Sequence, residues 1–330
     1  MSHFPPPPQV PPKVGLFRRV PPAIFPAMLG LLGLVAVWRR AVETFGFPAP
    51  VVDMAAGMVT LLFAYCLVAY GAKFAQRPAV VAEDLRTLPG RTGLAALFIG
   101  LMVEAQVLAP MAQGLAKACL LIGVLGLVAI ALQVLPQRVR GTDTAGPITP
   151  AMHLVFVGFI LVPGAAVPLG VAGGLLPWLI WYCAVAAILI TALSIRPLLT
   201  GGGQPPLRPL QVIHLAPAGF VASGALLVGQ PVLGAAALVW AALLAAVFLI
   251  RLRWLTEGEF SGFWSAFTFP VTAFAGALLI AARVYDMEPL RYLGGLILVA
   301  ATLYIPVIAY RVLKLWAKGV LAAKTNAAIA

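Results

Sequence analysis

The 330-residue chain is short of charge, of acidic side chains and of cysteine. Charged residues make up only 10% of it and hydrophobic residues 62%. Soluble domains carry roughly 25% charged residues, so a soluble protein is excluded. The acids and histidines form no cluster within the apolar stretches, and no nucleophile–base pair appears there. We therefore expect no enzyme, no metal site and no cofactor.

The three cysteines, Cys66, Cys119 and Cys183, fall in separate apolar stretches and match no zinc or redox spacing. Buried thiols in apolar helices usually act as small hydrophobes, so we expect no function of them. The N-terminus also lacks the pattern of a cleavable signal peptide, because prolines fill positions 5–8 and the first basic residue is Lys13. We expect residues 1–19 to form an extended, proline-rich tail.

Apolar stretches of membrane-spanning length fill the rest of the chain, whose mean hydropathy is +1.03. About 20 apolar residues cross a bilayer as a helix, which predicts ten spans. These spans are residues 20–38, 51–72, 92–109, 114–135, 149–167, 175–195, 210–228, 232–250, 262–282 and 290–310. One all-α membrane domain over residues 20–315 follows, with a second tail over residues 316–330.

The basic residues predict the orientation of these spans. Seventeen of the 22 lysines and arginines fall on the side of the N-terminal tail, and five fall on the other side: Arg39, Arg40, Lys117, Arg283 and Arg291. By the positive-inside rule, both termini are then cytoplasmic. This topology also explains the net charge of +12 without nucleic-acid binding, since the bases are spread over short loops.

The odd-numbered spans share prolines, glycines and phenylalanines, whereas the even-numbered spans are smoother runs of alanine, leucine and valine. Proline leaves a backbone carbonyl without its donor, which a neighbouring helix or water can satisfy but lipid cannot. The pattern predicts five helical hairpins, with the odd helices inside around a central pore and the even helices outside.

A solid bundle, in which these residues only kink or pack helices, is the alternative. The equal depth of Pro26, Pro217 and Pro270 in their spans favours equivalent positions in a ring.

The ninth span carries the most specific pattern, Trp264-Ser265-Ala266-Phe267-Thr268-Phe269-Pro270-Val271-Thr272. Two further motifs accompany this pattern: residues 26–33 of the first span, which is followed by Trp38, and residues 215–219 of the seventh span. At these residues the chain resembles the tellurite-resistance/dicarboxylate transporter family, which includes the slow-type anion channels of plant guard cells.

The resemblance implies ten helices in five hairpins, a homotrimer with one pore in each subunit, and transport of anions. It also implies that a phenylalanine of the ninth span plugs the pore, a role that maps onto Phe269. Phe267 is the nearest rival, and packing between helices is the alternative for both. Phe25, Phe98, Phe159 and Phe220 are further candidates to line the pore, with ordinary helix packing as the alternative for each.

Three ionisable residues within the spans, Glu104, His153 and His214, are further candidates for functional roles. Glu104 departs from the family pattern and has three possible roles: proton coupling, a subunit contact, or a structural hydrogen bond to a neighbouring helix, with Gln106 as a candidate partner. His153 and His214 lie near the cytoplasmic ends of their spans. They are candidates for the inner vestibule, where they could sense pH or be merely interfacial.

Arginines near the cytoplasmic ends of the spans could concentrate anions at the inner mouth, although positive-inside topology explains them equally well. The candidates are Arg86, Arg91, Arg208 and Arg253.

The residues and the resemblance together predict an anion channel or channel-like transporter, gated by Phe269 and passing small inorganic or organic anions. The resemblance and the short loops imply that it lies in the bacterial inner membrane. The alternative is a proton-coupled exporter of dicarboxylates or oxyanions that uses Glu104.

Overall fold

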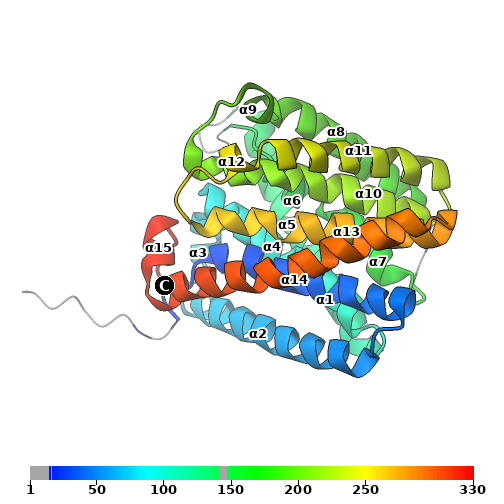
Figure 1. Cartoon of the computed structure of the whole chain (residues 1–330). Coiled ribbons are helices and arrows are strands. Elements are labelled where there is room, and N and C mark those ends of the chain that lie inside the picture. The colour runs from blue at the N-terminus through cyan, green and yellow to red at the C-terminus, as the bar shows by residue number, and fades with distance from the viewer. Residues whose placement is uncertain (1–14, 16, 142–146, 172) are drawn as a thin grey trace, which may run out of the picture.

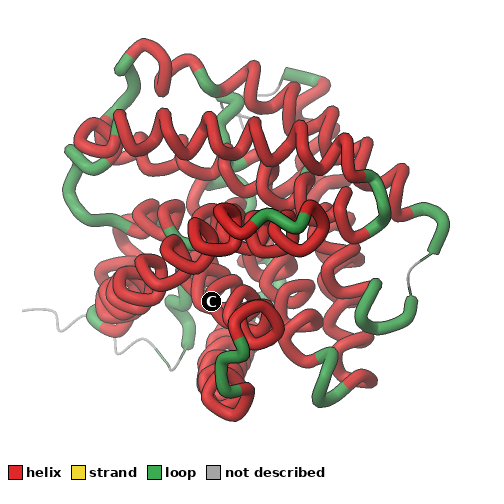
Figure 2. Tube along the Cα trace, turned by 45° about the vertical axis from the view of Figure 1, so that its right-hand side comes forward, coloured by secondary structure: helices red, strands yellow, loops and turns green. Residues whose placement is uncertain are grey.

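The computed structural model describes residues 15, 17–141, 147–171 and 173–330, and in these residues it contains helices and no strands (Figures 1 and 2). Most of the expected tail over residues 1–19 lies outside the described residues. The long helices are α1 (Phe25–Phe45), α2 (Ala49–Gln76), α4 (Leu88–Leu108), α5 (Gln113–Val139), α8 (Leu176–Ser194), α10 (Leu215–Leu227), α11 (Pro231–Ile250), α13 (Phe269–Tyr285) and α14 (Glu288–Ala317). The short helices are α3 (Val80–Asp84), α6 (Met152–Phe156), α7 (Val162–Ala166), α9 (Arg196–Thr200), α12 (Leu252–Leu255) and α15 (Val320–Lys324), with 3-10 segments η1 (Pro22–Ile24), η3 (Gly158–Leu161), η4 (Pro205–His214) and η5 (Gly262–Phe267).

Among the described residues, nine helices are long and apolar enough to cross a membrane. They fall into two groups by burial. In α1, α4, α10 and α13, counted with their 3-10 lead-ins, 72–89% of the most apolar stretch is buried, against 22–39% in α2, α5, α8, α11 and α14. The odd-numbered spans at these positions are therefore the buried ones, and the even-numbered spans present apolar side chains to the surroundings.

Each buried helix packs against the exposed helix that follows it in the chain: α1 on α2, α4 on α5, α10 on α11 and α13 on α14. The buried helices also contact one another, α1 with both α4 and α13, and α10 with α13. In Figure 1 the long helices run broadly side by side. The core is therefore built mainly from α1, α4, α10 and α13.

Residues 149–167, expected as the fifth uniform span, form three short pieces instead: α6, η3 and α7. The sequence explains the break. Pro163 stands in the first turn of α7, and glycine stands at positions 158 and 164. A Cβ at Gly158 would lie 2.8 Å from Ile99 Cδ1, so any larger residue there would have to displace the Ile99 side chain of α4.

Pro26, Pro217 and Pro270, the prolines at equal depth, lie where a 3-10 segment changes into an α-helix. η1, η4 and η5 lead directly into α1, α10 and α13, and Pro26, Pro217 and Pro270 stand in the first turn of those α-helices. A proline in the first turn costs little, because the amide it lacks would have no partner inside the helix. These prolines therefore begin α-helices rather than kink them in the middle.

Residues 316–330, expected as a tail, are partly helical and packed. α14 continues to Ala317, and α15 buries Leu321 and Ala322. The backbone amide of Ala328 donates to Asp84 Oδ1 at 2.8 Å. The C-terminal segment is thus docked against the end of the bundle where α3 lies (Figure 1).

Candidate functional site

Phe269 is the first residue of α13, and its side chain is held between two other buried helices. It is 8% exposed, and its ring lies on that of Phe220 of α10, with centroids 5.0 Å apart and planes tilted by 33°. On the α1 side, a Cβ at Gly33 would lie 2.6 Å from Phe269 Cδ2. Only glycine at position 33 lets the ring approach α1 this closely.

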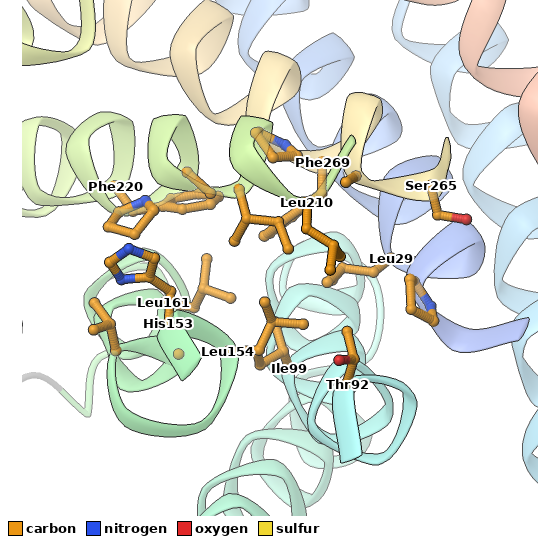
Figure 3. Close-up of a pocket in the computed structure, with 18 of the residues that line it drawn as sticks. Leu29, Thr92, Ile99, His153, Leu154, Leu161, Leu210, Phe220, Ser265 and Phe269 are labelled. Atoms are coloured by element: carbon orange, nitrogen blue, oxygen red, sulfur yellow. The ribbon is translucent and has the colours of Figure 1, made fainter. Parts of the chain in front are cut away.

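An apolar cavity of about 70 Å³ lies on one side of these rings. Its walls come from α1, α4, α6, η3, η4 and η5 and from the N-terminal parts of α10 and α13. Figure 3 shows Leu29, Ile99, Leu154 and Leu210 around one space. The polar side chains on its wall are His153, Thr92 and Ser265. We call this space the apolar cavity.

Two further cavities lie on the other side of these rings. The middle cavity, of about 20 Å³, shares Leu161, Phe220 and Phe269 with the apolar cavity. The wide cavity, of about 700 Å³, shares Ala36, Arg40 and Gln106 with the middle cavity. The shared walls place the three cavities in succession, and Leu161 and the two phenylalanines separate the first from the second.

The remaining phenylalanines expected along the pore line none of these three cavities. Phe25 faces α2, where its ring lies 6.3 Å from Phe63 and 5.9 Å from Tyr70. Phe98 faces α5, since a Cβ at Gly126 would meet its ring at 2.1 Å. Phe159 lies in η3 and is partly buried against the core. Of the four, Phe220 alone lines any of the three cavities, where it forms part of the wall shared by the apolar and middle cavities.

The two histidines come together although they are far apart in the sequence. His153 Nε2 lies 2.9 Å from His214 Nδ1, and the hydroxyl of Thr191 lies 3.4 and 3.3 Å from these same two nitrogens. Both rings are buried, at 2% and 0% exposed. His153 lines the apolar cavity and His214 does not. Of the two histidines, His153 alone therefore contacts one of the three cavities.

Glu104 is buried, 3% exposed, and belongs to the contact between α4 and α2. Thr60 Oγ1 donates to Glu104 Oε1 at 2.6 Å. Gln106, the partner considered from the sequence, instead donates weakly to the carbonyl of Leu161 at 3.4 Å and lines the middle and wide cavities. Glu104 lines none of the three cavities, so its carboxylate does not face them.

The arginines that line the cavities belong, by the expected topology, to the side opposite the cytoplasmic candidates. Arg86, Arg91, Arg208 and Arg253 line none of the three, and Arg208 is paired with Glu257 and stacked on Trp254. The wide cavity contains three other arginines: Arg39, Arg40 and Arg283. The consecutive Arg39-Arg40 pair at the end of an apolar span was the available signal, because a charge there needs water or a counter-charge.

No three His, Cys, Asp or Glu side chains lie close enough to hold a metal ion anywhere in the described part of the chain. The three cysteines are free thiols. The site is therefore a series of cavities closed by aromatic rings, with arginines at one end.

The fold and this site define a multi-pass, all-α membrane protein whose buried helices surround internal cavities. Residues 19–313 match the family model described as SLAC1, voltage-dependent anion channel. The match covers most of the chain, which therefore belongs to this family of anion channels and transporters. No individually curated protein matches it.

Proposed function

We propose that the protein conducts small anions through the three cavities and that Phe269 is the plug of this conduit. The observation that carries the proposal is the shared wall: the rings of Phe269 and Phe220, with Leu161, stand between the apolar cavity and the middle cavity. Aromatic side chains at such a constriction block passage sterically and exclude water. A change of side-chain rotamer would open the conduit without movement of the helices.

The lining explains why the conduit would favour weakly hydrated anions. The apolar cavity offers few polar groups, so an anion there must shed part of its water. At the far end, arginines attract negative charge and repel cations. We propose small monovalent inorganic or organic anions as the substrates.

We further propose a homotrimer in a bacterial inner membrane, with both termini cytoplasmic. The distribution of lysine and arginine between the loops supports the orientation. Exposed apolar faces on the outer helices, with Leu61, Trp178 and Leu296 more than half exposed, fit contact with lipid or with other subunits. Because the cavities lie inside one subunit, each subunit would conduct separately.

Chloride efflux from proteoliposomes tests the plug. We expect Phe269→Ala to raise the efflux rate on the order of tenfold over wild type, because the ring no longer fills the constriction. Phe267→Ala is the matched control: it removes the same ring two residues away, where Phe267 packs against Trp264 and lines none of the three cavities. Equal efflux from the two variants would argue against Phe269 as the plug.

A further inference from the structure

Arg40 lies where the middle cavity meets the wide cavity. It lies near the end of α1 and lines both the middle and the wide cavity, on the side of Phe269 away from the apolar cavity. From Pro26 to Arg40 the axis of α1 rises about 21 Å at 1.5 Å per residue, so Arg40 lies well beyond the apolar cavity. Gly276 of α13 is a neighbour of the Arg40 side chain, since a Cβ there would lie 3.9 Å from Arg40 Nε, an ordinary van der Waals contact.

The charges around the wide cavity are not balanced. Arg39 Nη1 binds Asp53 Oδ1 at 2.8 Å, and Arg283 Nη1 binds Glu43 Oε2 at 2.7 Å. Each of these arginines therefore has a carboxylate. The side chain of Arg40 makes neither an ion pair nor a hydrogen bond with any described residue, although Glu43 is near enough to act on it electrostatically.

An arginine that is partly buried inside a membrane protein without a counter-ion is costly. The cost falls when an anion binds, because a guanidinium offers several N–H donors in one plane. A second donor is close by: Gln106 lines the same two cavities, and its amide is engaged only by the weak 3.4 Å contact with Leu161. The positive charge and the amide thus face the same space.

We propose that Arg40, assisted by Gln106, binds one small monovalent anion of the size of chloride or nitrate just beyond Phe269. This inference rests on the proposed conduit, of which the site would be the first binding position past the plug. A single unpaired arginine neutralises one negative charge, whereas a dianion such as malate would keep an unbalanced charge in the cavity. The site therefore favours monovalent anions over dicarboxylates.

Binding is measured first on the full-length, otherwise wild-type protein in detergent, where no conduction is needed. Sodium nitrate is titrated against sodium gluconate at constant ionic strength, and the thermal unfolding midpoint is followed. We expect nitrate to raise the midpoint of the wild type and of Arg291→Gln, which removes a surface charge paired with Glu288. We expect no nitrate-dependent shift in Arg40→Gln. If nitrate raised the unfolding midpoint of Arg40→Gln as much as that of Arg291→Gln, the proposal would be overturned.

The second measurement records chloride currents in the Phe269→Ala background. Loss of a charge-assisted hydrogen bond in Arg40→Gln should raise the half-saturating chloride concentration at least about tenfold. Arg40→Lys keeps the charge and should stay within about a factor of three of the parent, which also shows that the position tolerates substitution. Half-saturation in Arg40→Gln equal to that of the Arg291→Gln control would contradict the site.

The two measurements separate the site from the conduit. If Phe269→Ala carries no current but nitrate stabilises the wild type and not Arg40→Gln, the anion site stands and the conduit fails. If Phe269→Ala conducts and Arg40→Gln changes neither binding nor half-saturation, the conduit stands and the site is rejected.

Discussion

Glu104 shows at the scale of one residue how the structure distinguishes between the roles considered for an acid in a membrane helix. One carboxylate oxygen accepts a hydrogen bond from Thr60, and the other, Oε2, has no partner among the described residues. The carboxyl lies between α4 and α2 and outside the cavities. This geometry favours a structural hydrogen bond over proton coupling to an anion in the conduit.

We therefore predict that Glu104→Gln leaves anion flux and its pH dependence unchanged, because the amide oxygen can still accept the Thr60 hydrogen bond. Chloride and malate flux in proteoliposomes, with and without a pH gradient, provides the measurement. Loss of uptake driven by a pH gradient in Glu104→Gln alone would instead support a proton-coupled exporter.

Neighbouring residues also show why the sequence could place the helices but not their rotation. Phe25 faces α2, whereas Pro26, the next residue, lines the apolar cavity. Phe98 faces α5, whereas Ile99 lines the cavity. One residue along an α-helix turns the side chain by about 100°. An aromatic residue in a buried helix therefore does not reveal its direction, because both directions meet apolar surroundings.

At the scale of elements, the alternation of buried and exposed helices could be predicted, since proline and glycine collect where neighbouring protein can satisfy the backbone. The break of residues 149–167 into α6, η3 and α7 was not predicted, because proline and glycine occur in several of the odd-numbered spans and do not show which of these spans is interrupted. The pairing of His153 with His214 depends on contacts between separate segments, which span boundaries do not give.

A buried ion pair joins three elements at the end of the bundle near α3. Asp84 accepts hydrogen bonds from Lys73 Nζ at 2.8 Å and the Tyr70 hydroxyl at 2.9 Å in α2, and from the amide of Ala328. Lys73 also donates to the carbonyl of Val20 before α1. The side chains of Lys73 and Asp84 are fully buried. The pair thus fixes α2, α3 and the C-terminal segment to one another.

We predict that Asp84→Ala lowers the free energy of unfolding by about 3–5 kcal/mol, because it leaves the buried Lys73 without its counter-ion. Glu83→Ala is the control: Glu83 pairs with Arg77, but both side chains are 40% exposed, so solvent screens the pair and little change is expected. Thermal and denaturant unfolding in detergent would measure both. Similar losses in the two variants would contradict the importance given to the buried pair.

At the scale of the whole molecule, the protein combines an apolar outer surface with the apolar, middle and wide cavities in succession. α2, α5, α8, α11 and α14 are mostly exposed in their apolar stretches, as lipid contact requires, whereas α1, α4, α10 and α13 are mostly buried. The wide cavity contains arginines and lies near the C-terminal end of α1. With Phe269 as the proposed plug, we expect the conduit to open at this one side chain rather than by rearrangement of helices.

The proposed closure of the conduit by Phe269 is tested most directly by current through planar bilayers. The proteins compared are purified wild type, Phe269→Leu, Phe269→Val and Phe269→Ala. We predict that chloride conductance rises stepwise as the side chain at position 269 becomes smaller, while Phe267→Ala stays at the wild-type level. Equal conductance in all five proteins, or the largest conductance in Phe267→Ala, would contradict an anion conduit closed by Phe269.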